Sequence, residues 1–259
     1  MKIAKLFGIM ISAFGASSAF AAGAGGHFSW TQFIPGVAEN HMIHVATLAI
    51  VSVLLVLLGL VARVRLGSGE AAVIPEDRVT VRGFFEVILE FINNLSDTVI
   101  GHHGRKFAPM FASIFVFIFF SNLIGLIPGM TAPTDNLNTG LALGLFSFAV
   151  YNYYGIKENG IGYIKHFMAN MTNGAWLLFG LLLLVLELIS HLVRPFSLGL
   201  RLMANIQGDH TILGVFTDLI PIGAPIPFYL LGLFVCFMQA FIFTVLSMVY
   251  ISIATAHDH

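Results

Sequence analysis

The stretch "LELISHLVRPFSLGLRLMANIQGDH", residues 186–210, places charged side chains inside a run that is otherwise strongly apolar. It belongs to a longer apolar segment, 175–216, which as one helix at about 1.5 Å per residue would approach twice the thickness of a bilayer core. Such a segment has to tilt, kink or fold into a hairpin. Pro195 is the candidate for a kink, because a proline frees the carbonyl group four residues earlier.

The composition of the whole chain indicates a membrane protein. Its 259 residues are 58% hydrophobic and only 10% charged, far from the composition of a water-soluble domain. Several apolar runs reach the roughly 20 residues that a helix needs to cross a bilayer core, and helices satisfy the backbone without water. The formal net charge of -1 gives no reason to expect nucleic acid as a partner. The sequence therefore predicts an all-α integral membrane protein with the lipid bilayer as its surroundings.

About five membrane helices are expected, together with one amphipathic helix. The stretch "VRGFFEVILEFINNLSDTVIG", residues 81–101, separates apolar from polar side chains at helical spacing, as an interfacial helix does. It is predicted to lie on the membrane instead of crossing it. The predicted spans are 44–62, 107–127, 139–155 and a long tilted pair formed by 175–216 and 227–256.

The orientation follows from two independent signals. Residues 1–21 combine two lysines, an apolar stretch and the small-x-small pattern "AFA" of a signal peptidase site. They predict a cleaved signal peptide, with an uncleaved anchor as the alternative, and leave 22–259 as a single membrane domain with its amino terminus outside. Six of the 12 Lys and Arg residues lie within 63–106, which places that region and the carboxyl terminus in the cytoplasm. The loop 129–140 has no Lys or Arg and is expected outside.

Polar residues recur at helical spacing inside the longest apolar segment. Positions i, i+4, i+7 and i+8 from residue 201 share one face of a helix, and four polar residues upstream keep the same register. A second, thinner stripe in the final segment could face the first. The first stripe comprises Glu187, Ser190, His191, Arg194, Arg201, Asn205, Gly208 and Asp209, and the second comprises Gln239, Ser247 and Tyr250.

Arg201 is the most informative member of the first stripe. A charge at mid-membrane depth costs about 2.5–3.5 kcal/mol on insertion scales, so it usually marks an ion path or a paired charge. An arginine keeps its proton at any workable pH, so Arg201 can attract a carboxylate and block a cation but cannot pass protons on. Its partner is either Glu187 or Asp209 in this chain or an acid on another subunit. The small number of acids in this chain favours another subunit.

The other polar side chains leave two interpretations open. Carboxylates and imidazoles such as those of Glu187, His191, Asp209 and His210 can titrate near physiological pH and form a proton path, whereas each histidine can equally be a hydrogen-bonded core or interface residue. The uncharged Asn122 and Gln239 can serve a function or simply link helices. Near the ends of the chain, solvation is a better explanation than a metal site for His27, His41, His44, His257 and His259.

The lone cysteine, Cys236, lies in an apolar run and cannot form an intramolecular disulfide or a cysteine-based metal cluster. It is interpreted as a packing residue. No cofactor is expected.

Several motifs together resemble subunit a of the bacterial F-type ATP synthase. They are "FSNLIGLIPG", "YGIKENGIGYIKHF", "LELISHLVRP", "RPFSLGLRLMANIQGDH" and "QAFIFTVLSMVYIS", and the similarity covers residues 40–256. The resemblance implies a membrane stator in the bacterial inner membrane, with two proton half-channels against a rotating ring of c subunits, that couples proton translocation to ATP synthesis. It also implies the b subunits of the peripheral stalk as partners, the F1 sector as an indirect one, and no nucleotide site in this chain.

The resemblance also assigns roles by position. Arg201 would face the ring carboxylate, and His210 occupies the place where relatives carry Glu or His. Relatives usually carry a Glu or His seven residues before the glutamine, where this chain has Gly232, and Asp209 is the candidate for the missing acid. The remaining matches are Asn205 and Gln239 near the arginine, Glu187 and Ser190 in a half-channel, and Asn122 in the "NL" segment.

Two other classes of protein share some of these features but fit the sequence less well. A secondary transporter also carries intramembrane charges, at broken helices, but the chain has no internal repeat and few spans. An intramembrane enzyme or haem protein would need a catalytic motif or a pair of ligating histidines. The sequence contains no HExxH, no GxSxG with a partner, and no histidine pair on two facing upright spans.

Overall fold

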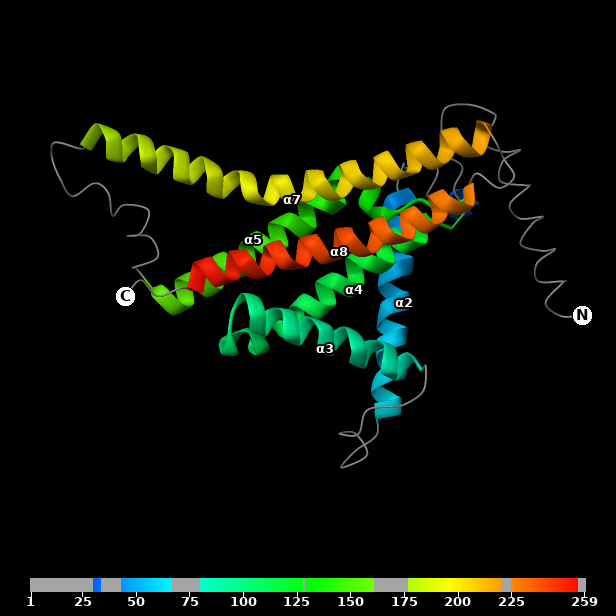
Figure 1. Ribbon diagram of the computed structural model, residues 1–259, viewed down its shortest axis with the longest axis horizontal. Helices are drawn as coiled ribbons and strands as arrows, with labels where there is room; N and C mark the ends of the chain where they lie inside the picture. The colour runs from blue at the N-terminus through cyan, green and yellow to red at the C-terminus, as the bar shows by residue number, and fades with distance from the viewer. Residues whose placement is uncertain are drawn as a thin grey trace, which may run out of the picture. The chain divides into compact units, whose positions relative to one another are not determined.

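The computed structural model describes residues 30–33, 43–66, 80–127, 129–160, 177–219 and 225–255. This part of the chain forms helices and no β-strand, which confirms the predicted all-α fold (Figure 1). Three short 3-10 helices are η1 (Trp30–Phe33), η3 (His102–Phe107) and η4 (Pro133–Asp135). The six α-helices of this part are α2 (Ile43–Leu66), α3 (Val81–Val99), α4 (Ala108–Gly125), α5 (Leu137–Asn159), α7 (Leu177–Leu219) and α8 (Pro225–Thr255).

Three of these helices are long and apolar enough to cross a membrane, judged by length and composition alone. They are α2, the stretch Gly104–Gly125 that ends with α4, and Ile226–Thr255 of α8. The helices α5 and α7, which carry more polar side chains, are not among them. The predicted signal peptide, 1–21, lies outside the described residues, as do His27, His41, His257 and His259.

The long segments that the sequence predicted to tilt, kink or fold into hairpins each form one helix. The helix α7 has 43 residues with Pro195 inside it, and α8 has 31 residues. Helical spacing therefore holds along the whole polar stripe of α7.

The chain divides into two compact units, and α4, α7 and α8 each contribute to both, as does α3, whose residues 81–84 belong to the first unit. The first unit comprises Met1–Phe84, Val116–Asn136 and Met203–Ala240. The second comprises Phe85–Phe115, Leu137–Leu202 and Phe241–His259.

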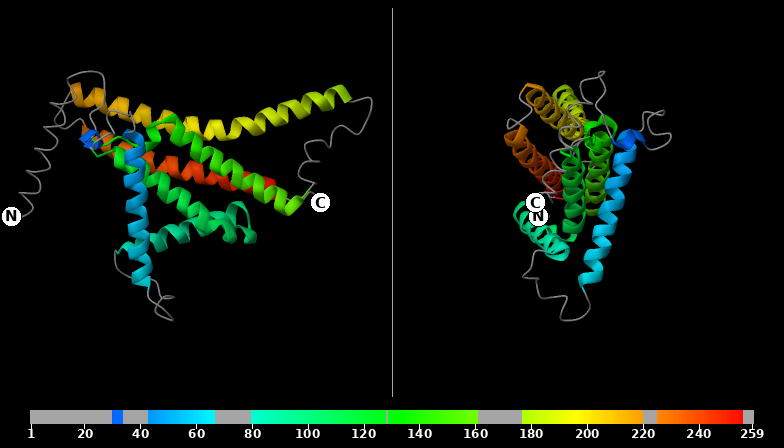
Figure 2. Two further views of the ribbon diagram at one scale, coloured as in Figure 1. Left: turned by 180° about the vertical axis from the view of Figure 1, so that it is seen from behind. Right: turned by 90° about the vertical axis from the view of Figure 1, so that its right-hand side faces the viewer.

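In the first unit, α2 packs against η1 and η4, and η1 lies beside one end of α2 (Figure 2). The backbone N–H of Trp30 donates to the carbonyl of Gly129 at 2.8 Å. Gly129 has a φ of 80°, and a Cβ there would collide with the Trp30 ring. Only glycine fits this turn on both counts. Stacked rings of Phe216 and Phe228, with centroids 4.1 Å apart, join the end of α7 to the start of α8.

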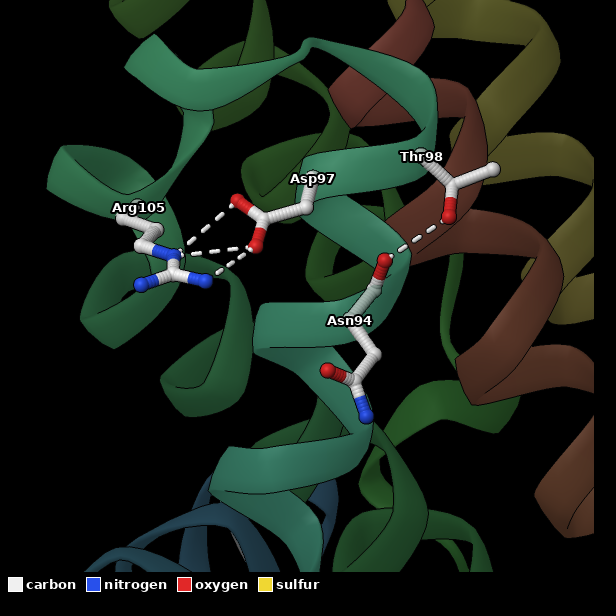
Figure 3. A network of polar contacts seen from close by, with 4 residues as sticks. All are labelled: Asn94, Asp97, Thr98 and Arg105. Atoms are coloured by element: carbon white, nitrogen blue, oxygen red, sulfur yellow. Dashed lines mark hydrogen bonds and ion pairs between the residues drawn. The ribbon is translucent and has the colours of Figure 1, made fainter.

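In the second unit, α3 is amphipathic, as predicted. It buries Ile88 and Ile92 and exposes Glu90. The guanidinium of Arg105 in η3 reaches back to Asp97 of α3, with Nη2 2.7 Å from Oδ2 and Nε 2.9 Å from the same oxygen (Figure 3). This pair ties the turn after α3 to the helix, just before the chain enters α4.

Candidate functional site

The polar stripe of α7 runs along the border between a packed face and an open face of the helix. His191, Leu198 and Leu202 are buried on one side of this border. On the open side, the residues of the polar stripe are exposed. They are Glu187, Ser190, Arg201, Asn205 and Gly208.

Arg201 makes none of the ion pairs found in the described part of the chain. The alternative of a pair within the chain, with Glu187 or Asp209, is therefore not realised here. Along the axis of α7, at about 1.5 Å per residue, Glu187 lies about 21 Å before Arg201 and Asp209 about 12 Å after it. Among the described residues, the exposed side chain of Arg201 therefore has no ion-pair partner.

One turn after Arg201, Asn205 links α7 to α8 within the first unit. Its Nδ2 donates to Oε1 of Gln239 at 2.5 Å, and Gln239 is only 2% exposed. The Nε2 atom of Gln239 is buried and has no partner among the described residues. At this residue the second polar stripe does face the first, as the sequence suggested.

Asp209 fills the space beside Gly232. A Cβ added to Gly232 would lie 2.8 Å from Oδ2 of Asp209 and 2.6 Å from Cδ2 of Leu126. The carboxylate on α7 therefore occupies the volume that a side chain at position 232 of α8 would need.

His210 lies against α4 in the same unit. A Cβ on Gly125 would be 3.0 Å from Nε2 of His210, so the imidazole occupies the space beside this glycine. One turn earlier on α4, the buried Asn122 accepts a hydrogen bond from Oγ1 of Thr134 at 2.6 Å. Gln207 donates to the backbone carbonyl of Asp135 at 3.3 Å. Residues of α4 and η4 thus line this half of α7.

Sequence reasoning missed Ser121, Thr134 and Asp135 in this neighbourhood. Oγ of Ser121, Oδ1 of Asp135 and Nδ2 of Asn122 are buried without a partner among the described residues. Buried polar atoms of this kind normally have a partner, protein or water. For Thr134 and Asp135 the available signal was the polar stretch "TDN", residues 134–136, which was interpreted only as part of an external loop.

In the second unit, the buried His191 packs against α5 and makes polar contacts with it. Its Nε2 is 3.0 Å from Oδ1 of Asn152 and 3.5 Å from the hydroxyl of Tyr151, and the residue is 9% exposed. Its surroundings match those of a hydrogen-bonded core histidine, one of the two interpretations left open. Sequence reasoning missed Tyr151 and Asn152, because isolated polar residues in an apolar span do not reveal which helix they face.

The second stripe divides between two neighbours in this unit. The guanidinium of Arg194 lies over the ring of Tyr250, 5.1 Å from its centroid, so Tyr250 faces α7. Ser247 instead pairs with Ser147 of α5, their hydroxyl oxygens 2.9 Å apart. The expectation that this stripe faces α7 is wrong for Ser247.

Comparison with known proteins agrees with the resemblance drawn from the motifs. The family model described as ATP synthase A chain matches residues 42–252. An ATP synthase subunit a from Bdellovibrio bacteriovorus is 54% identical over 233 residues, covering 90% of this chain and 99% of that protein. The subunit a of a Sulfurihydrogenibium species is 45% identical over 177 residues, covering 68% of this chain and 83% of its own. The chain therefore belongs to the ATP synthase subunit a family, whose members are components of a multisubunit enzyme.

Proposed function

We propose that this chain is the membrane stator that provides two proton half-channels against a rotating ring of c subunits and so couples proton translocation to ATP synthesis. The observation that carries the proposal is Arg201, a permanent charge exposed on α7 without an ion pair in the described part of the chain. An uncompensated charge at membrane depth calls for a partner of opposite sign. A carboxylate on each ring subunit would supply that partner in turn.

The order of polar residues along α7 supports two separate channels. Glu187, Ser190 and His191 precede Arg201, whereas Asn205, Asp209 and His210 follow it. Each group contains side chains that can accept or release a proton. The fixed charge of Arg201 stands between the groups along the helix, where it would prevent protons from passing directly from one to the other.

The electrostatic role of Arg201 follows from elementary charge attraction. A positive charge held a few ångströms from a carboxylate in a low-dielectric gap favours its ionised form. A ring carboxylate that took its proton from one half-channel would release that proton into the other half-channel as it nears Arg201. After passing Arg201 it would be protonated again from the first half-channel, so each passage would move one proton across the membrane.

The group that follows Arg201 extends onto α4 and α8. Gln239 is bonded to Asn205, and Asn122 lies on α4 one turn from the glycine that His210 covers. We assign Asp209 as the acid of this half-channel, because its carboxylate occupies the space beside Gly232. This geometry supports the suggestion that Asp209 replaces an acid that relatives carry on α8.

The proposal extends to the partners and the location. The b subunits of the peripheral stalk would hold the chain in place against the ring, and the F1 sector would be reached through them. We place the chain in the bacterial inner membrane with its amino terminus outside and its carboxyl terminus in the cytoplasm. The clustering of Lys and Arg in 63–106 supports this orientation.

The test is ATP-driven proton pumping in inverted membrane vesicles that carry Arg201→Ala. Pumping, followed with a pH-sensitive dye, is expected to disappear while the attached soluble sector still hydrolyses ATP. Arg65→Ala, at the exposed end of α2, is the matched control and is expected to pump normally. Pumping at the wild-type level in Arg201→Ala would mean that the charge is only structural, and the proposal would be abandoned.

A further inference from the structure

Within the second unit, α5 and α7 approach each other backbone to backbone. A Cβ on Gly140 would lie 2.6 Å from the carbonyl oxygen of Gly199, and one on Gly199 would lie 2.8 Å from the carbonyl carbon of Gly140. A Cβ on Gly144 would collide with the carbonyl oxygen of Pro195. All four residues are buried, and Figures 1 and 2 show α5 crossing α7 near the middle of α7. We call these four residues the glycine crossing.

The crossing is one part of a regular antiparallel contact. Moving four residues forward on α5 and four back on α7 leads from Gly140 and Gly199 to Gly144 and Pro195. The same step leads on to Phe148 and His191, whose ring centroids are 5.1 Å apart. One contact per turn is the pattern of helices that pack along their i±4 ridges. Small residues at such a spacing let helices in a membrane come close, and carbonyl oxygens then face Cα–H groups.

Pro195 is a weak point of α7. A proline has no backbone N–H to donate, so α7 lacks one backbone hydrogen bond at this residue and is prone to bend there. Contacts with α5 flank the weak point on both sides. The imidazole of His191 is bonded to Asn152 one turn before it, and Gly199 packs on Gly140 one turn after it.

Arg201 follows Gly199 by two residues, so the crossing fixes the backbone from which the guanidinium extends. We propose that the glycine crossing positions Arg201, so that its guanidinium lies at the membrane depth, and at the distance from its carboxylate partner, at which the two charges meet. This inference rests on the proposed function, and it makes Gly140, Gly144 and Gly199 positioning residues. A methyl group on Gly144 would have to push α7 away from α5. Misplacing a functional group by about 1 Å can cost roughly 100-fold in rate.

The test compares Gly144→Ala and Gly140→Ala in inverted vesicles of the whole enzyme. The readout is the rate of proton pumping divided by the rate of ATP hydrolysis in the same vesicles. Loss of assembled enzyme lowers both rates together and leaves this ratio unchanged, whereas a displaced Arg201 lowers the ratio. We expect the ratio to fall by about tenfold or more, as for a misplaced reacting group. Gly59→Ala on α2 is the control, because a Cβ there meets nothing within 4 Å.

A distance measurement checks the cause. Spin labels at Leu145→Cys and Leu200→Cys, two exposed positions on α5 and α7, are introduced in a Cys236→Ser chain. Gly144→Ala is expected to lengthen the distance between the labels, and Gly59→Ala is expected to leave it unchanged. An unchanged distance with a wild-type ratio would overturn the inference. Failure of both glycine variants to assemble would also overturn it, because the crossing would then serve folding alone.

Arg201→Ala, measured in parallel, separates this inference from the function it rests on. If Arg201→Ala itself keeps the wild-type ratio, the proposed function fails. If Arg201→Ala loses pumping while both glycine variants keep the wild-type ratio, the function stands and only the positioning role is lost.

Discussion

The carboxylate of Asp209 occupies the space that a side chain at position 232 would fill, and glycine at this position leaves that space open. Because α8 carries no side chain at that point, the acid on α7 can reach the surface of α8 without a clash. Under the proposed function, the proton acceptor at this point would come from α7, and α8 would supply only the space for it.

Asp209→Asn tests whether the carboxylate carries protons. The amide has nearly the same shape, so it fills the space beside Gly232 but accepts no proton. Proton pumping is expected to fall at least about tenfold, since a positioned acid or base typically contributes 100-fold or more. The midpoint of thermal unfolding in detergent is expected to stay near the wild-type value. Normal pumping in this variant would remove Asp209 from the proposed path.

A double-mutant cycle measures how much the hydrogen bond between Asn205 and Gln239 contributes to the free energy of unfolding. Asn205→Leu leaves the buried amide of Gln239 without its partner and is expected to cost about 1–3 kcal/mol of stability. Gln239→Leu removes the buried polar atoms themselves and is expected to cost less. The double variant is expected to be more stable than Asn205→Leu alone. Additive effects in chemical unfolding would show that the two side chains do not interact.

At the scale of one residue, the sequence indicated which side chains have unusual chemistry but not which residues they contact. The charge of Arg201 within an apolar segment and the polar pattern around it were evident from composition and spacing alone. The contacts of His191 were not, because Tyr151 and Asn152 come from a helix with no polar periodicity. Hydrogen bonds between distant segments depend on how helices are placed, which a local pattern does not contain.

At the scale of one element, apolar length predicted the helices well. The predicted spans 44–62, 107–127 and 139–155 are helical and correspond to α2, α4 and α5, although α5 is not among the helices that are apolar enough to cross a membrane. The long segment 175–216 left tilting, kinking and a hairpin open, and it forms the single helix α7. Proline does not end this helix, and α5 contacts α7 on both sides of Pro195. These contacts come from Asn152 and Gly140 of another helix, so the sequence of α7 could not predict them.

The amphipathic helix α3 is held both by apolar packing and by an exposed ion pair, and the contributions of the two to stability can be compared. Ile92 is fully buried, and Ile92→Ala is expected to cost about 2–5 kcal/mol, the usual range for a buried isoleucine. Asp97→Ala removes the exposed pair with Arg105 and is expected to leave stability close to the wild-type value, since exposed ion pairs contribute little. Thermal unfolding of the purified protein measures both variants. A larger loss from Asp97→Ala would mean that the ion pair, not apolar packing, holds α3.

At the scale of the whole molecule, composition alone identified a helical membrane protein, and the combined motifs identified its family. What the sequence could not give is the division of α4, α7 and α8 between two compact units. Units of this kind are built from segments far apart in the chain, whose pairing depends on tertiary contacts. The orientation in the membrane is a different matter, because it depends on charge distribution, which the sequence contains in full.

Thiol labelling of single-cysteine variants tests that orientation directly. In a Cys236→Ser chain, Arg65→Cys lies within the region 63–106 and replaces one of its six positive charges, and Met130→Cys lies in the loop without Lys or Arg. Because Lys and Arg are retained on the cytoplasmic side, a membrane-impermeant reagent added to spheroplasts is expected to label Met130→Cys and to spare Arg65→Cys. A permeant reagent should label both and serves as the control. The opposite pattern would invert the topology and would exchange the two half-channels, since the groups before and after Arg201 would then open to the other sides.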